Sequence, residues 1–232
     1  MLQFNKKEVK SVEMVISDYL KDKVHNFKIG IIIYNNITVS ESPQMLKGRL
    51  QLFQESLYLD FENTVVTDVP EISEWRSIFK QIGTDPNRYR HSAESLVRRV
   101  SKQNFIPSIH SAADVNNFFS LYYKIPSGIY DLDKLSAGIS LEVGTENDQY
   151  IGINGRIMNF KDKLVTKDGN GPFGSPIVDS QRTAVTFDTK NAVQIVYLLP
   201  SFDLDRCNNI VTSISNMFVQ IHGGEAVSKV IQ

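Results

Sequence analysis

The hydrophobic pattern of this 232-residue chain changes its period near Leu135. Upstream, apolar residues recur three and four positions apart, as between Trp75 and Ile82, which is the spacing of one helix face. Downstream, short apolar segments are separated by turn residues, and Asn154-Gly155 is a strong hairpin signal. The change predicts an α+β fold, with a helical N-terminal part packed on a sheet-rich C-terminal part of mixed or antiparallel strands. A chain of this length forms one large domain or two lobes that share a core.

The first part of the chain is expected to contain a helix over residues 7–21 and a strand over 27–34. Asn35-Asn36 tolerates positive φ, so we expect a hairpin that returns into residues 37–39. Ser42 is the expected N-cap of the next helix, with Pro43 at its first position. A further helix follows Pro70 and stops at Gly83.

Two more helices are expected between residues 88 and 124. Ser92 is the predicted N-cap of the first, and Arg98, four residues after Glu94, is placed to form an intrahelical ion pair. Ser111 is the predicted N-cap of the second, with Asp114 completing a capping box.

In the C-terminal part we expect strands and one long helix. The expected strands cover residues 139–143, 150–153, 156–159, 183–187 and 193–199, the last almost continuously apolar and so central, and the expected helix covers residues 204–221. Residues 168–176 are rich in glycine and proline and are predicted to form a loop that could line a pocket.

Composition and charge limit the classes of function. The formal net charge is −1, which argues against coating nucleic acid through bulk charge. Charge is nevertheless uneven along the chain. Residues 53–74 carry acids and no Lys or Arg, whereas the charged residues within 76–102 are mainly basic. This asymmetry predicts a local positive face, with two ordinary solvated faces as the alternative. Cys207 is the single cysteine, and no apolar run reaches the length of a membrane span, so we expect a cytoplasmic protein.

Motifs for metal and cofactor chemistry are absent from the sequence. His25, His91, His110 and His222 show no metal-ligand spacing, and the glycine-rich loop lacks the spacing of a phosphate-binding loop. Neither a serine-nucleophile motif nor a local Cys-His signature is found. We therefore expect no metal and no cofactor.

Four polar positions stand out near the predicted start of the second helix. His110 could present its imidazole to an anionic or carbonyl group, or could be an ordinary surface histidine. Asp114 is more readily a cap than a base. Asn116 and Asn117 are poor interior helix formers, so at least one is expected to bind a ligand or to hold a neighbouring loop.

These residues lie in a segment that resembles a known family. The run ADVNNFFSLYYKIPSGIYDLDKL is similar to the pattern VDVTNYVxLExGQPxHAFDLDKL of the B3/B4 domain in the phenylalanyl-tRNA synthetase β subunit. Upstream, WRSIFKQIGTDPNRYRHSAESLVRRV resembles free-standing B3/B4 proteins. The resemblance covers roughly residues 70–200. It implies a single B3/B4-like domain over residues 1–232, with an N-terminal helix-hairpin-helix part (1–69) and a core (70–232).

In the synthetase, the resembled domain is the editing site that hydrolyses a mischarged aminoacyl ester. The resemblance places the pocket among residues 107–117, 125–131, 152–156 and 171–183. This chain departs from the pattern: Gly128 stands where the synthetase has histidine, Asn116 where it has threonine, and its later glutamate falls near Gln194.

The resemblance implies the following roles. The catalytic candidates are His110, as base or water-orienting group, and Asn116. The substrate-binding candidates are Asn117, Pro126, Ser127, Gly128, Gly174, Asp179, Arg182 and Thr183. The candidates for binding RNA phosphates are Arg88, Arg90, Arg98, Arg99 and Lys102.

Two functions remain open at this stage. The first is a stand-alone protein that binds tRNA or aminoacyl-tRNA and hydrolyses a mischarged species in trans. The second is a non-catalytic module that binds RNA or an amino-acid-like ligand. Neither implies a membrane partner, and the oligomeric state is left undetermined.

Overall fold

The computed structural model describes residues 13–232. A central sheet has the strand order β10-β2-β9-β3, in which all pairs are antiparallel. Its strands are β2 (Lys28–Asn35), β3 (Ser127–Asp131), β9 (Ala192–Leu198) and β10 (Glu225–Ile231). Every residue of β9 is buried, which confirms the prediction that this apolar strand is central.

A second sheet has the order β1-β4-β7-β8. Its strands are β1 (Met14–Ile16), β4 (Ile139–Val143), β7 (Leu164–Asp168) and β8 (Gly171–Gly174); β1 is parallel to β4, and the other pairs are antiparallel. Strands β5 (Gln149–Ile151) and β6 (Ile157–Asn159) form the predicted separate hairpin, with Gly155 at a φ of +77° in its loop.

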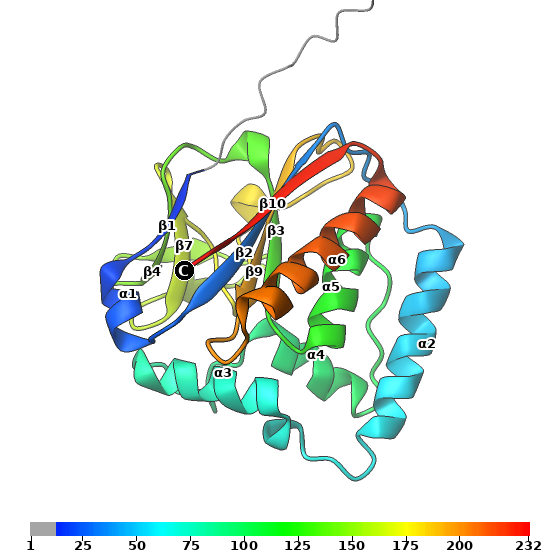
Figure 1. Cartoon of the computed structure of the whole chain (residues 1–232), viewed down its shortest axis with the longest axis horizontal. Coiled ribbons are helices and arrows are strands. Elements are labelled where there is room, and N and C mark those ends of the chain that lie inside the picture. The colour runs from blue at the N-terminus through cyan, green and yellow to red at the C-terminus, as the bar shows by residue number, and fades with distance from the viewer. Residues whose placement is uncertain (1–12) are drawn as a thin grey trace, which may run out of the picture.

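Helices α2 (Gln44–Asp60), α4 (Ser92–Val100), α5 (Ser111–Tyr123) and α6 (Leu204–His222) lie on the side of the central sheet that faces away from the second sheet (Figure 1). Helix α3 (Pro70–Gln81) crosses the bottom of the molecule in this view, where its Trp75 contacts Tyr197, and the short α1 (Asp18–Lys23) lies beside β4. Three-residue 3₁₀ turns occur at Val66–Asp68, Leu132–Lys134 and Gln181–Thr183. The result is the predicted α+β fold. One hydrophobic core extends from Met14 to Phe218 and draws on both sheets and the helices.

The two faces of the central sheet have different neighbours, and this positions the site. On β9, Gln194 hydrogen-bonds to α5 through Asn116, whereas Tyr197 on the opposite face hydrogen-bonds to Thr166 of the second sheet. On β3, Ser127 contacts α5, whereas Tyr130 packs against Phe173 of β8. Strand β3 therefore links the helical layer to the second sheet.

Several expectations near the N-terminus are wrong. The helix expected over 7–21 begins outside the described residues, and residues 14–16 form a strand instead, followed by α1. The hairpin after Asn36 does not form: Asn36 has a φ of +57°, but the N–H of Ile37 donates to Lys190 and that of Thr38 to His222. Strand β2 pairs with β9 and β10 instead, because a strand that is buried on both faces lies inside a sheet.

The predicted serine N-caps are also wrong: α2 begins one residue later than expected, whereas α4 and α5 each begin one residue earlier. Ser42 Oγ donates to Asp114 Oδ2 at 2.5 Å, and α2 starts at Gln44 without a side-chain cap. In α4 and α5 the capping residues are histidines: His91 Nδ1 accepts from the Glu94 N–H and His110 Nδ1 from the Ala113 N–H, both at 3.2 Å. The predicted serines occupy the first turn instead.

The strand expected over 183–187 is also wrong, because this segment forms only a single bridge, between Ala184 and Tyr130, before it turns. Conversely, part of the expected loop 168–176 is strand β8.

Candidate functional site

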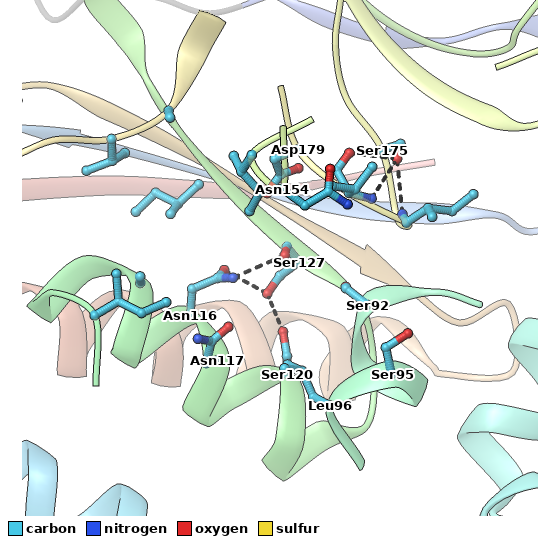
Figure 2. Close-up of a pocket in the computed structure, with 18 of the residues that line it drawn as sticks. Ser92, Ser95, Leu96, Asn116, Asn117, Ser120, Ser127, Asn154, Ser175 and Asp179 are labelled. Atoms are coloured by element: carbon cyan, nitrogen blue, oxygen red, sulfur yellow. Dashed lines mark hydrogen bonds between the residues drawn. The ribbon is translucent and has the colours of Figure 1, made fainter. Parts of the chain in front are cut away.

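A pocket of about 470 Å³ lies between the helical layer and the segments that follow β8. Helices α4 and α5 form one side, and the segments 152–154 and 175–179 form the other (Figure 2). Ser127 and Ile129 of β3 lie between them. All four segments implied by the resemblance contribute residues to its lining.

The floor of the pocket is a hydrogen-bonded amide and hydroxyl network (Figure 2). Asn116 Nδ2 donates to the Ser127 carbonyl at 3.1 Å, and Asn116 Oδ1 accepts from Ser127 Oγ and Gln194 Nε2, both at 2.8 Å. Ser120 Oγ lies 2.9 Å from Ser127 Oγ, and Tyr34 donates to Gln194 Oε1 at 2.7 Å. Asn116 is thus held in place, with both acceptor positions of its oxygen used.

Asp179 lies across the cavity from this floor (Figure 2). Its Oδ1 accepts a 2.6 Å hydrogen bond from the hydroxyl of Tyr130, which is fully buried. Burial raises the pKa of Asp179 to about 7, against the smaller lowering effects of the Tyr130 hydroxyl and the Ser175 backbone. The pKa of Tyr130 is raised well above its ordinary value, mainly by burial, so the phenol remains a proton donor.

Two glycines leave the space that the Tyr130 hydroxyl occupies. A Cβ at Gly128 would lie 2.1 Å from this oxygen and 2.8 Å from Asp179 Oδ1, and a Cβ at Gly174 would lie 2.3 Å from the same oxygen. Any side chain at position 128, including the histidine of the synthetase pattern, is therefore incompatible with this tyrosine conformation. Gly128 and Gly174 lie behind the pocket wall and are not part of its lining.

His110 reaches the pocket from the start of α5. Burial lowers its pKa below the ordinary value, partly offset by the charge of Asp114, so the ring is mainly neutral at pH 7. Because Nδ1 accepts the Ala113 N–H, the proton of the neutral ring is assigned to Nε2. His110 thus offers a donor, and its ring also contacts the exposed Phe187 edge-on, with centroids 6.0 Å apart.

Asp114 is buried and holds the segment before α5. It accepts from Ser42 Oγ, from Ser108 Oγ and, at 2.9 Å, from the Ile109 N–H. These three donors hold the segment that leads to His110. The predicted capping box with Ser111 is not formed, because the Ser111 N–H donates to the Ser40 carbonyl. Asp114 is not part of the pocket lining.

The arginine face of α4 is organised around one buried carboxylate. Glu94 is 0% exposed, and nitrogens of Arg76, Arg90 and Arg98 lie 3.1, 3.9 and 2.9 Å from its Oε1. The predicted Glu94–Arg98 pair is therefore present, as one part of a larger cluster. Arg99 is exposed at the pocket.

The remaining predicted residues are divided between the pocket and its surroundings. Asn117, Ser127 and Asp179 line the pocket. Pro126 is buried beside the pocket, and its carbonyl accepts a hydrogen bond from the backbone N–H of Tyr197. Arg182 forms two hydrogen bonds with Asp168, and Thr183 is fully buried. Arg88 and Lys102 are exposed outside the lining.

Sequence reasoning missed Tyr130 and the pocket residues Ser175 and Asn154. Ser175 Oγ accepts from the N–H groups of Ile177 and Val178, which shapes the turn that carries Asp179. The Gly-Ser-Pro sequence at this turn was an available signal. Nothing in the sequence distinguished Tyr130 from an ordinary aromatic residue of the core.

Within residues 13–232, no group of three or more His, Cys, Asp or Glu side chains is placed to hold a metal ion. The same residues contain no helix that is long and apolar enough to cross a membrane.

Comparison with known proteins decides the family. The model of the B3/4 domain matches residues 74–219, more than half of the chain. The chain belongs to the B3/4 domain family. YhzB of Bacillus subtilis (strain 168) is 34% identical over 209 residues, which cover 90% of this chain and 94% of that protein. The similarity of this B3/4 protein to YhzB therefore extends over nearly the full length of both.

Phenylalanine–tRNA ligase β subunits are more distant relatives of this B3/4 protein. The subunit of Fusobacterium nucleatum is 21% identical over 169 residues, 62% of this chain, but the match spans only 21% of that subunit. A solved N-terminal fragment of the phenylalanyl-tRNA synthetase β subunit from Pyrococcus horikoshii is 13% identical, with a TM-score of 0.47 over 100% of this chain and 57% of the fragment. The match to the B3/4 domain model confirms the family resemblance seen in the sequence.

Proposed function

We propose that this B3/4 protein binds the aminoacyl end of a tRNA and hydrolyses a mischarged aminoacyl ester in trans. The observation that carries the proposal is Asp179: a carboxyl group with a pKa of about 7, oriented by Tyr130, on the wall of a pocket of about 470 Å³. A general base works best when its pKa is close to the operating pH. The volume suits an aminoacyl group with part of its ribose.

In the proposed reaction, Asp179 is the base. Its carboxylate takes a proton from a water molecule, whose oxygen forms a bond to the ester carbonyl carbon. The bond from that carbon to the ribose oxygen then breaks, and the ribose oxygen receives the proton from Asp179. The products are a free amino acid and a tRNA with a free terminal hydroxyl, so no other reactant is needed.

His110 is proposed as a donor to the oxyanion, in place of the base role considered from the sequence. Its Nδ1 is already engaged with the Ala113 N–H, and the neutral ring carries its proton on Nε2. A positioned neutral donor is suited to an oxygen that becomes negative during reaction. Asn116 is proposed to shape the floor rather than to take part in proton transfer, because its oxygen already accepts two hydrogen bonds.

The tRNA backbone is proposed to approach along α4. Three arginines surround one glutamate there, so the cluster keeps a positive balance, and Arg99 adds an exposed charge at the pocket. Phosphate contacts of this kind position a nucleic acid without reading its sequence.

A panel of radiolabelled aminoacyl-tRNAs tests the proposal. Loss of one aminoacyl species above the spontaneous rate supports an editing hydrolase and identifies its substrate. Salt-sensitive tRNA binding without deacylation supports the second candidate, a binding module. The self-contained network around Asn116 is the observation that favours this alternative, since it would form a rigid recognition surface without any reaction.

A further inference from the structure

Helix α2 lies at the outer edge of the molecule (Figure 1). It carries exposed apolar side chains. Met45 is 74% exposed, Leu52 68% and Leu59 61%, and they are spaced seven residues apart. That spacing aligns them on one face of the helix. Single exposed apolar residues are common, but a row of three on one helix is typical of a contact surface.

The exposed face of α2 is symmetric about Leu52. Positions seven, four and three residues before Leu52 match positions at the same distances after it. All the matched residues are exposed. The matched pairs are Met45 with Leu59, Gly48 with Ser56, and Arg49 with Glu55.

We propose that this face binds the same face of a second copy of the chain, with the two α2 helices antiparallel about a two-fold axis at Leu52. A two-fold contact brings each residue opposite its symmetry-related position. Leu52 then meets Leu52 of the second copy, and Met45 meets Leu59. Gly48, which has no atom within 4 Å of an added Cβ, lies in a layer with Ser56, so the two backbones can approach closely.

The charged residues of this face favour a second copy of the chain as the partner and an antiparallel arrangement of the two α2 helices. Among the residues that the structure describes, Arg49 and Glu55 form no ion pair with another charged residue. The Arg49 guanidinium lies 3.7 Å from Met217 Sδ and 5.8 Å from the centroid of the Phe118 ring, and Glu55 accepts a hydrogen bond from Gln51. In the antiparallel arrangement Arg49 shares a layer with Glu55 of the second copy, twice in each dimer. A parallel arrangement would place Arg49 beside Arg49, which is repulsive.

Sedimentation equilibrium of the full chain tests the proposal over about 1 to 100 µM, the range expected of a contact at the small end of interface sizes. The wild type is expected to reach twice the mass of one chain, and Leu52→Glu to remain monomeric because two carboxylates would meet at the axis. The control is Val227→Glu on the edge strand β10, a side chain that is 55% exposed. A wild type that stays monomeric throughout, or a dimer lost in the control but kept in Leu52→Glu, overturns the proposal.

Charge reversal tests the antiparallel direction. Arg49→Glu and Glu55→Arg are each expected to weaken dimerisation about tenfold, because each creates two like-charged contacts. The double variant is expected to return to within about threefold of the wild type. A double variant that is as weak as the single variants contradicts the antiparallel arrangement. Both residues are exposed, so the charge-reversal variants are expected to keep the melting temperature of the wild type. An unchanged melting temperature excludes misfolding as the cause of weaker dimerisation.

Discussion

The Tyr130 hydroxyl donates a 2.6 Å hydrogen bond to Asp179 Oδ1 in a space that Gly128 and Gly174 leave open. The pair joins strand β3 to the turn after β8, two segments about fifty residues apart in the sequence. It brings a buried phenol from the core into contact with a carboxyl group of the pocket.

Tyr130→Phe is predicted to shift the pH profile of deacylation upward. The tyrosine hydrogen bond lowers the pKa of Asp179, so its removal raises that pKa above about 7 and leaves less carboxylate at neutral pH. A rise of one unit reduces the rate at pH 7 about fivefold and restores it at high pH. Single-turnover rates between pH 6 and 9 measure the shift. An unchanged midpoint would mean that Tyr130 acts only as a core residue.

Asp179→Asn is predicted to stabilise the protein at pH 8. The folded-state pKa of about 7 lies above the ordinary value of 3.8, so the stabilising contribution of Asp179 is fully present below about pH 3.8 and is lost as pH rises to 7. The uncharged amide avoids this loss and still accepts from Tyr130. The free energy of unfolding is expected to increase by about 1–3 kcal/mol at pH 8, with almost no difference at pH 4. Urea denaturation at both pH values measures it, and a difference that does not vary with pH contradicts the raised pKa.

His110 can be tested apart from its capping role. His110→Asn keeps a good N-cap for α5, whereas His110→Ala loses the cap and costs about 1 kcal/mol of stability. If Nε2 donates to the oxyanion, both variants lose about 10²-fold in deacylation rate, although only the alanine variant is less stable. Full activity in His110→Asn would restrict His110 to capping.

Arg99 and Arg98 are adjacent but differ in their surroundings. Arg99 is exposed at the pocket, whereas Arg98 Nε lies 2.9 Å from the buried Glu94. Arg99→Gln is predicted to weaken tRNA binding several-fold and to lower the slope of log K against log salt by about 1. Arg98→Gln is predicted to affect stability more than binding. Filter binding at several salt concentrations separates the two effects, and equal losses of affinity would argue against a specific role for Arg99.

The helical elements were predictable because their signals are local. Helix α3 follows Pro70 and ends before Gly83, and the apolar spacing between them identifies its buried face. For α4 and α5 the predicted serine caps were one residue late, because histidines took the capping positions. Sequence rules favour serine there, and tertiary hydrogen bonds decided otherwise: Ser111 Oγ lies 2.8 Å from His222 Nε2.

The site was only partly predictable, since its decisive contact is long-range. Asn116, Asn117, Ser127 and Asp179 were expected from the family pattern and do line one pocket. The partner of Asp179 could not be inferred, because nothing local to Tyr130 indicates a residue about fifty positions away. Gly128 looked like the loss of a functional histidine, but in the structure it makes room for the Tyr130 hydroxyl.

The most direct test compares the wild type with Asp179→Asn in single-turnover hydrolysis of the aminoacyl-tRNA that the panel identifies, at pH 7.5. The variant is nearly isosteric, retains an acceptor for Tyr130 and is predicted to fold at least as stably. A base role for Asp179 predicts hydrolysis by the wild type and a loss of at least about 10²-fold in the variant, with tRNA affinity unchanged. Equal rates in the two proteins, or no hydrolysis by the wild type of any aminoacyl-tRNA in the panel, would contradict it.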